Sequence, residues 1–186
     1  MPAPIPVALP EQPLVGEGIA LRRWRDDDLA ALVAICSDPD VARFTRVPDG
    51  YTEADGRAWL AAQQGRLREG EGFALAIVAP GDPAPVGACS LHVDPADRDA
   101  AELGYNVAAH ARGRGLASAA VRLLSAWAFA EWRMARLQLT THVDNAASQR
   151  VAERCGFQRE GVLRSWAEIK GGRVDLVMFS RLATDP

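Results

Sequence analysis

A glycine-containing loop is the stretch of this sequence best suited to binding a ligand. The segment ELGYNVAAHARGRGLASAAV, residues 102–121, passes from an alternating pattern through Gly113 and Gly115 into a mostly apolar helical pattern. A glycine turn before a helix exposes main-chain N–H groups, and the positive end of the helix dipole favours an anion there. The loop therefore predicts a phosphate-binding site.

Two common phosphate-binding loops do not fit these residues. A P-loop ends in Gly-Lys followed by Ser or Thr, because the lysine must reach the outer phosphates, and this loop has no lysine. A dinucleotide-binding loop reads Gly-x-Gly-x-x-Gly, but Ser118 stands where the third glycine would be. A glycine turn that only begins a helix stays an alternative.

The surrounding pattern predicts one α+β domain over residues 15–182, preceded by an extended Pro-rich tail at residues 1–14. Apolar alternation predicts strands near 16–24, 72–80, 84–94, 100–108 and 135–144, with two more between 158 and 182. Helical spacing and capping residues predict helices near 26–38, 52–70, 114–132 and 145–156, with an irregular segment at 41–50. These elements make a mixed sheet of about seven strands with four helices.

Composition limits the partners, the cellular location and the metal sites that we expect for this protein. The net charge of −3 over 186 residues predicts neither a nucleic-acid partner nor an anionic membrane partner. The first residues lack the pattern of a secretion signal, and no apolar stretch is long enough to span a membrane, so we expect a cytoplasmic protein. The three cysteines, Cys36, Cys89 and Cys155, and the three histidines show no metal-ligand spacing. We expect no metal, and cysteines that are buried as small apolar residues.

The loop and its neighbours resemble a known family. The run Arg112-Gly113-Arg114-Gly115-Leu116-Ala117 is similar to the Arg/Gln-x-x-Gly-x-Gly/Ala loop of the Gcn5-related N-acetyltransferases, or GNAT family. Around it, AELGYNVAAHARGRGLASAAVRLL, VDNAASQRVAERCGF, REGVLRSW and GGRVDLVMFS resemble the RimJ/RimL branch, which is named for ribosomal-protein N-acetyltransferases. The resemblance extends over about residues 15–182.

The resemblance implies acetyl-coenzyme A (acetyl-CoA) as co-substrate. In this fold two neighbouring strands separate, pantetheine lies in the gap like an added strand, and the pyrophosphate meets the N–H groups of the loop. Glycines at 113 and 115 would let the phosphates approach the main chain closely. The cofactor-binding residues implied are Asn106, Val107, Ala108, Arg112, Gly113, Arg114, Gly115, Leu116, Ala117 and Asn145. A solvated role for the two arginine side chains stays an alternative.

Ser148 is the residue expected to assist the leaving thiolate. Many members of the family carry a tyrosine for this purpose at the position occupied here by Ala152, which has no hydroxyl. Positions 148 and 152 are neighbours on one helix face, so Ser148 lies one turn earlier along the same surface, as in the RimL-like branch. A serine that only caps the helix or lies on its surface is the alternative.

Glu102 is the expected base. It shares a strand face with Gly104 and Asn106, and it resembles the family position proposed to accept the proton of the amine. Tyr105 falls on the opposite face and is expected in the core. A structural strand carboxylate is the alternative for Glu102.

The substrate predicted is a primary amine that takes the acetyl group directly. At pH about 7.5, about a third of a peptide α-amine with pKa about 7.8 is unprotonated, against about 0.1% of a lysine amine with pKa about 10.4. One glutamate without a tyrosine therefore favours a protein N-terminal α-amine. The alternatives are a small-molecule amine (an amino acid, a polyamine or a drug) and a catalytically silent acyl-CoA-binding module. Acceptor specificity is expected from Arg43, Phe44, Arg46 and Tyr51, and a homodimer is left open.

Overall fold

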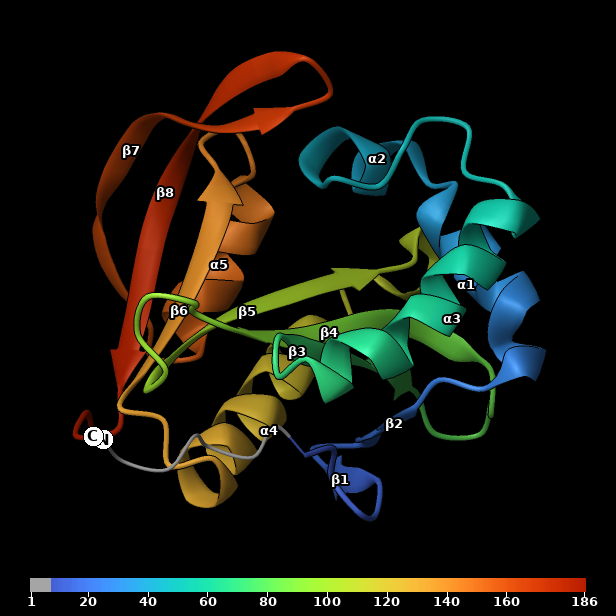
Figure 1. The fold of residues 1–186 in the computed structure, drawn as a ribbon, viewed down its shortest axis with the longest axis horizontal. Helices are drawn as coiled ribbons and strands as arrows, with labels where there is room; N and C mark the ends of the chain where they lie inside the picture. The colour runs from blue at the N-terminus through green and yellow to red at the C-terminus, as the bar shows by residue number, and fades with distance from the viewer. Residues whose placement is uncertain (1–7) are drawn as a thin grey trace.

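An eight-stranded mixed sheet with helices on both faces makes up this computed structural model (Figure 1), which describes residues 8–186. The strands are β1 (Leu14–Gly16), β2 (Ile19–Arg23), β3 (Gly72–Val78), β4 (Pro85–Val93), β5 (Ala100–Val107), β6 (Arg136–His142), β7 (Gln158–Ile169) and β8 (Gly172–Leu182). Their order is β1-β2-β3-β4-β5-β6-β8-β7, and β5–β6 is the one parallel pair among these strands. The α+β class predicted from the sequence is confirmed.

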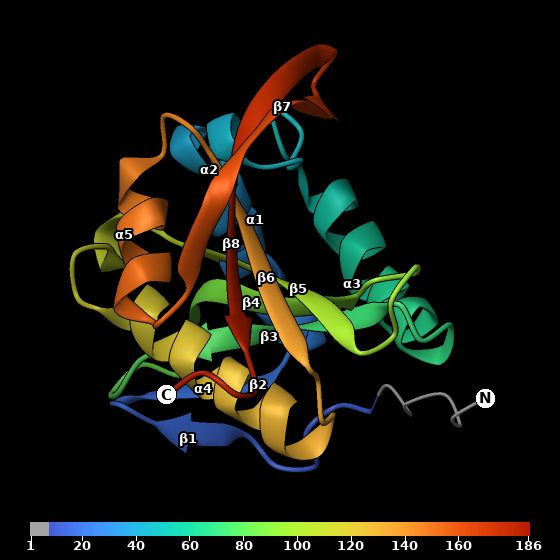
Figure 2. The ribbon, with the colours of Figure 1, turned by 90° about the vertical axis from the view of Figure 1, so that its left-hand side faces the viewer.

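Five α-helices lie within residues 8–186: α1 (Leu29–Cys36), α2 (Pro39–Phe44), α3 (Glu53–Arg68), α4 (Leu116–Glu131) and α5 (Ala146–Arg154). Short 3-10 turns at Asp26–Asp28 and Ala109–Ala111 precede α1 and α4. Figures 1 and 2 together show α4 and α5 on one side of the sheet and α1 and α3 on the other. None of these helices combines the length and apolar character needed to cross a membrane.

Two elements differ from the sequence prediction. β1 adds a strand because Glu17 (φ 52°) and Gly18 (φ 74°) form a tight turn between paired strands. α2 adds a helix whose residues 41–44 fall in the segment predicted to be irregular, 41–50. Asp38 caps α2 by accepting from the Asp40 N–H at 2.8 Å, and Pro39 takes the first helical position. Both elements are too short to show a clear periodic pattern.

The described part of the Pro-rich segment packs against the domain. Trp132 Nε1 donates to the Ala8 carbonyl at 3.2 Å, and Leu9 packs on the main core. β1 begins at Leu14, which was the last residue of the predicted tail. The prediction of an extended tail for residues 1–7 falls outside the described residues.

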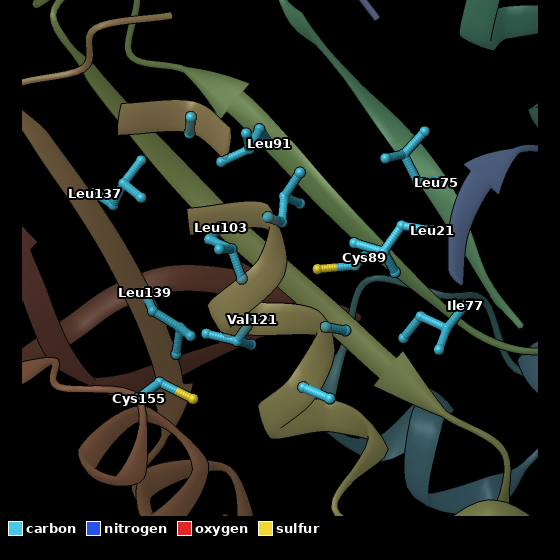
Figure 3. Packing of buried hydrophobic residues seen from close by; sticks show 14 of the residues in the cluster. Leu21, Leu75, Ile77, Cys89, Leu91, Leu103, Val121, Leu137, Leu139 and Cys155 are labelled. Carbon is cyan, nitrogen blue, oxygen red and sulfur yellow. The ribbon is translucent and has the colours of Figure 1, made fainter. Parts of the chain in front are cut away.

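The main core lies between the sheet and α4 (Figure 3). Its fully buried members include Leu91 of β4, Leu103 of β5, Leu137 of β6 and Val121 of α4. Because α4 is packed along its length against the sheet, its first turn is held beside the end of β5. The three cysteines are free and buried, as predicted.

A smaller cluster joins α1 and α3 on the other side of the sheet. Leu32, Cys36 and Tyr51 are buried there, and the Trp24 and Trp59 rings meet edge to face with centroids 5.6 Å apart. Tyr51, which the sequence suggested for the acceptor site, is thus part of the packing between these helices.

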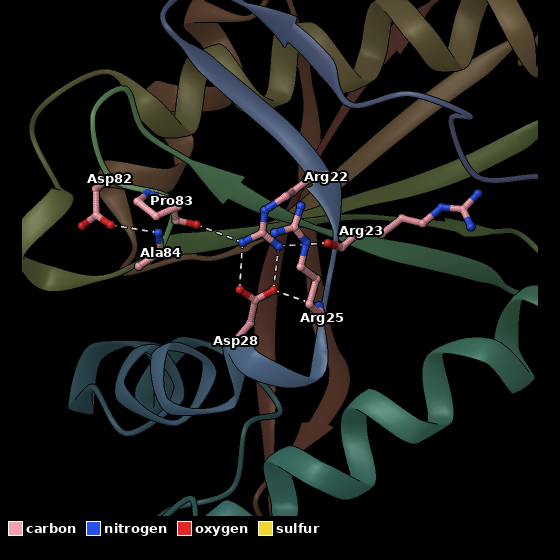
Figure 4. A network of polar contacts seen from close by, with 7 residues as sticks. All are labelled: Arg22, Arg23, Arg25, Asp28, Asp82, Pro83 and Ala84. Atoms are coloured by element: carbon pink, nitrogen blue, oxygen red, sulfur yellow. Dashed lines mark hydrogen bonds and ion pairs between the residues drawn. The ribbon is translucent and has the colours of Figure 1, made fainter.

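An ion pair ties β2 to the turn before α1 (Figure 4). Arg22 Nη1 and Nη2 donate to the Asp28 carboxylate at 2.6 and 2.8 Å, and Nη2 also donates to the Pro83 carbonyl at 2.9 Å. Asp28 accepts in addition from the Arg25 N–H at 2.8 Å. The side chains of Arg22 and Asp28 are 11% and 6% exposed. Burial alone would raise the pKa of Asp28, but the hydrogen bonds from Arg22 and Arg25 outweigh it and hold that pKa below its usual value.

Candidate active site

β5 and β6 are paired at one end and separate at the other. Among the described residues their ladder joins Ala100, Ala101 and Glu102 to residues 136–138 and then stops, although β5 continues to Val107 and β6 to His142. In Figure 1, β6 rises steeply while β5 runs nearly horizontally from left to right. Each strand stays paired on its outer edge, β5 with β4 and β6 with β8. The result is a V-shaped gap inside an otherwise continuous sheet.

Val107 turns its main chain toward this gap. The Ala108 N–H donates to the Val86 carbonyl at 2.9 Å, so by strand alternation the N–H and C=O of Val107 point away from β4. Arg112 Nε donates to the Val107 carbonyl at 3.0 Å, which leaves the Val107 N–H facing the gap. Both main-chain groups of Ala108 have partners in the fold, because its carbonyl accepts from the Ala111 N–H at 2.9 Å. The Val107 N–H therefore faces the gap, whereas the main-chain groups of Ala108 are used within the fold, and the pantetheine contact predicted for both residues stays a prediction.

The two asparagines predicted at the cofactor site use their side-chain oxygens within the fold. Asn106 Oδ1 accepts from the Ala88 N–H of β4 at 3.1 Å. Asn145 Oδ1 accepts from the Ser148 N–H at 3.0 Å and caps α5. For each, the amide nitrogen is the group that would donate to a ligand.

The glycine loop ends in a helix start that lacks a side-chain cap. Gly113 (φ 74°) and Gly115 (φ 78°) both occupy the left-handed region, and a Cβ on either would meet no other described atom within 4 Å. Gly115 is the N-cap, and the Ala119 N–H is the first to bond back to it, at 3.0 Å. The N–H groups of residues 116–118 are therefore left at the positive end of a 16-residue helix, where an anion would be stabilised.

The Arg112 side chain is held by α2. Its Nη1 and Nη2 atoms donate to Asp40 and Asp38, each at 2.8 Å, and its Nε donates to Val107 as described above. Burial alone would raise the pKa of Asp38, but hydrogen bonds from the Asp40 N–H and from Arg112 hold it below the usual value. Arg112 thus fixes the loop against the start of α2 while its side chain stays 36% exposed, and its predicted cofactor contact stays a prediction. Arg114 is exposed in the loop, and its predicted phosphate contact stays a prediction.

Ser148 lies on α5 across the gap from β5, where it meets Tyr105. The Ser148 Oγ and the Tyr105 phenol oxygen are 2.8 Å apart. Tyr105 is half-buried against the main core, as its strand face predicted, but its hydroxyl reaches the helix that carries Ser148. Burial raises the pKa of Tyr105 to about 12. Alternation indicated the face of Tyr105, but nothing local in the sequence indicated that α5 would cover that face.

Glu102 lies on the opposite face of β5, toward α1 and α3. Thr140 Oγ1 of β6 donates to Glu102 Oε1 at 2.6 Å, just past the last residue pair that joins the two strands. His92 is the partner of Glu102 in the β4–β5 ladder. Burial lowers the pKa of His92, and the nearby Arg66 acts in the same direction. Glu102 therefore has the Thr140 hydroxyl as a donor on one side and, on the other, the His92 imidazole, whose lowered pKa favours the neutral imidazole.

The same face is bordered by α2 and by the β7–β8 hairpin, whose tip reaches toward α2 in Figure 1. Phe44 of α2 and His142 of β6 have ring centroids 5.7 Å apart, and the Arg43 guanidinium lies 4.8 Å above the Phe44 ring. Lys170, in the hairpin turn, donates to the Ala42 carbonyl at 2.6 Å and pairs with Asp49. Arg43 and Phe44, which the sequence suggested for acceptor binding, thus border this face.

An open cavity of about 660 Å³ lies beside the glycine loop, between α1, α2 and the ends of β4 and β5. Its lining includes Asp38, Asp82, Ala108, His110 and Arg112. Neither Ser148 nor Glu102 lines it, so the cavity borders the candidate site without containing the residues expected to react.

Three similarities in sequence bear on the function of this site. Residues 19–158 match the family model described as "Acetyltransferase (GNAT) domain". The chain is 26% identical over 169 residues to "Uncharacterized N-acetyltransferase p20" of Bacillus licheniformis, which covers 91% of this chain and 95% of that protein. It is 39% identical over 97 residues to "Putative ribosomal N-acetyltransferase YdaF" of Bacillus subtilis (strain 168), covering 52% of each.

A solved structure has the same arrangement of elements. It is described as RimL, the ribosomal L7/L12 alpha-N-protein acetyltransferase, in complex with coenzyme A. The two superpose with a TM-score of 0.79 at 20% identity, over 92% of this chain and 98% of that one. Since the family model covers most of the chain, this protein belongs to the GNAT family of N-acetyltransferases.

Proposed function

We propose that this protein transfers the acetyl group of acetyl-CoA directly to a protein N-terminal α-amine. The observation that carries the proposal is the gap between β5 and β6. This gap opens beside the N-terminus of α4, where Gly115 is the N-cap. Pantetheine would lie against the Val107 N–H, and the pyrophosphate would accept from the N–H groups of residues 116–118. The coenzyme A in the RimL structure supports a ligand of this type.

The two faces of the gap divide the chemistry between acceptor and leaving group. On the face toward α1 and α3, Glu102 would take the proton of the amine as its nitrogen attacks the thioester carbonyl. The C–N bond forms, the C–S bond then breaks, and the electron pair goes to sulfur. On the α5 face, Ser148 would donate a hydrogen bond to that sulfur. The thiol of CoA has a pKa of about 8.5 if it resembles cysteine, so the thiolate is already a good leaving group.

The α-amine is favoured over lysine because the site offers one carboxylate as base. That carboxylate, Glu102, accepts from Thr140 Oγ1 at 2.6 Å. An α-amine with a pKa of about 7.8 enters partly deprotonated, whereas a lysine amine must lose its proton in the site. The name of YdaF, a ribosomal N-acetyltransferase, supports an acceptor that is part of a protein.

A panel of acceptors with acetyl-CoA tests the proposed function. Peptides with a free α-amine and no lysine should release CoA thiol and carry an acetyl group by mass spectrometry. Peptides with a blocked N-terminus and an internal lysine, and polyamines, should react at least about tenfold more slowly, because their amines are more fully protonated. A rise in melting temperature with CoA but no thiol release from any amine would instead identify a binding module.

Replacing the proposed base tests its role. We expect Glu102→Gln to lower kcat/KM at neutral pH by about 100-fold and to remove or displace the acidic limb of its pH profile. The amide still accepts from Thr140, so the fold should be kept. Glu71→Gln, which changes another carboxylate near His92, serves as the control. If Glu102→Gln keeps the wild-type rate and profile, the carboxylate is structural and the amine enters already deprotonated.

Removing the Ser148 hydroxyl tests the leaving-group side. We expect Ser148→Ala to lower kcat by about 10 to 100-fold with CoA affinity scarcely changed, because the hydroxyl acts when the C–S bond breaks. The Asn145 cap uses the Ser148 N–H and not its side chain, so α5 should stay capped in the variant. A normal kcat in a steady-state assay would limit Ser148 to a structural role.

A further inference from the structure

The pairing of Tyr105 with Ser148 has a consequence for how the leaving sulfur is stabilised. We propose that Tyr105 is a positioning residue, whose phenol O–H donates to Ser148 Oγ and so directs the Ser148 O–H toward the sulfur in the gap. This inference rests on the proposed acetyl transfer.

The two residues come from opposite walls of the gap. Tyr105 lies in the part of β5 beyond Glu102, where the ladder with β6 has ended, and Ser148 lies on the helix that follows β6. Their oxygens are 2.8 Å apart, which is ideal for an O–H···O bond. The main chain at Ser148 is fixed as well, because its N–H is held by Asn145. The hydroxyl pair therefore crosses the gap at a defined place.

The surroundings favour tyrosine as the donor. Besides Ser148 Oγ, the phenol has the Ser148 carbonyl within reach, but at 3.5 Å that contact is long for a hydrogen bond. If Ser148 donated instead, the phenol proton would be left with this poor acceptor. A phenol is also more acidic than an aliphatic hydroxyl, and so is the stronger donor. Donation from Tyr105 leaves the Ser148 proton free for the sulfur.

The pKa values of Tyr105 and of a thiol indicate that Tyr105 positions Ser148 and does not supply a proton. Burial raises the pKa of Tyr105 to about 12, whereas a cysteine-like thiol has a pKa of about 8.5. Passing the phenol proton through Ser148 to the thiolate would have an equilibrium constant of only about 10⁻³ to 10⁻⁴. Tyr105 therefore keeps its proton. The thiolate is stabilised by the Ser148 hydrogen bond and takes its proton from solvent after release.

A double-mutant cycle tests this assignment. Tyr105→Phe keeps the ring that packs on the core but removes the donor. We expect it to lower kcat by about fivefold to tenfold with the KM for acetyl-CoA unchanged, and to have no further effect on kcat in a Ser148→Ala background. Ser125→Ala removes a buried hydroxyl that has no hydrogen-bond partner among the described residues, and it should leave kcat unchanged in both backgrounds.

The outcomes distinguish this inference from the proposed function. Melting temperature with and without CoA shows that each variant folds and binds. A wild-type kcat in Tyr105→Phe, or an equal loss of kcat with and without the Ser148 hydroxyl, would overturn the positioning role while leaving acetyl transfer intact. If the wild-type protein releases no thiol with any acceptor, the proposed function itself is wrong.

Discussion

Gly115→Val is expected to abolish the stabilisation of this protein by CoA. A ligand that binds only the folded state at about 100 times its Kd raises the free energy of unfolding by about 2.7 kcal/mol, and at least 100-fold weaker binding would leave about 0.4 kcal/mol or less. The Gly115 Cβ position is open, and Gly115 directly precedes residues 116–118, whose N–H groups lie at the start of α4. A valine side chain there would occupy the approach of the pyrophosphate.

The substitution also has a cost in the protein without ligand, because Gly115 has φ 78° and valine is strained in that region. Gly18→Val is the matched control, since Gly18 has φ 74°, a similarly open Cβ position and a place in the β1–β2 turn. Both variants should lose about 1–2 kcal/mol of stability. Calorimetric melting with and without CoA should then separate them, because only the Gly115 variant loses the CoA response. Unchanged CoA affinity in that variant would contradict the assignment of the loop.

Asp28→Ala is expected to have the largest effect on stability. Among residues 8–186, the substitution leaves the buried Arg22 guanidinium with the carbonyls of Pro83 and Arg23 as its acceptors. Breaking a buried ion pair by removing one partner costs about 3–5 kcal/mol. Asp26→Ala, in the same turn but exposed, is the control and should change stability by no more than about 0.5 kcal/mol. Urea unfolding at neutral pH measures both.

The effect of Asp28 should depend on pH in a definite direction. Its pKa is lowered by folding, so its contribution is present above the unfolded pKa of about 3.9 and is lost as pH falls through the lower folded value. The difference in unfolding free energy between wild type and Asp28→Ala should therefore be constant above pH about 5 and shrink below about 4. A difference that stays constant down to pH about 2 would show that packing, not charge, carries the effect.

Much of the fold could be predicted because its signals are local. Alternating residues placed the long strands, and a capping box at Thr52 with Asp55 placed the start of α3, where both of its hydrogen bonds are present. The loop at Gly113 and Gly115 was predicted from two residues that tolerate positive φ, and both have it. The elements missed, β1 and α2, are short and depend on a tight turn and a single cap.

The sequence by itself determined which side chains and turns are available: a glycine loop at the start of α4, a carboxylate on one face of β5, and a serine on α5. Only the tertiary structure decided how these groups work together. The ladder between β5 and β6 stops after Glu102, and this depends on how each strand pairs with its other neighbour. Arg112 forms ion pairs with Asp38 and Asp40, which lie more than seventy positions earlier in the chain. Tyr105 meets Ser148, forty-three positions later. Such contacts join segments that approach only when the sheet and helices pack, so no local pattern encodes them.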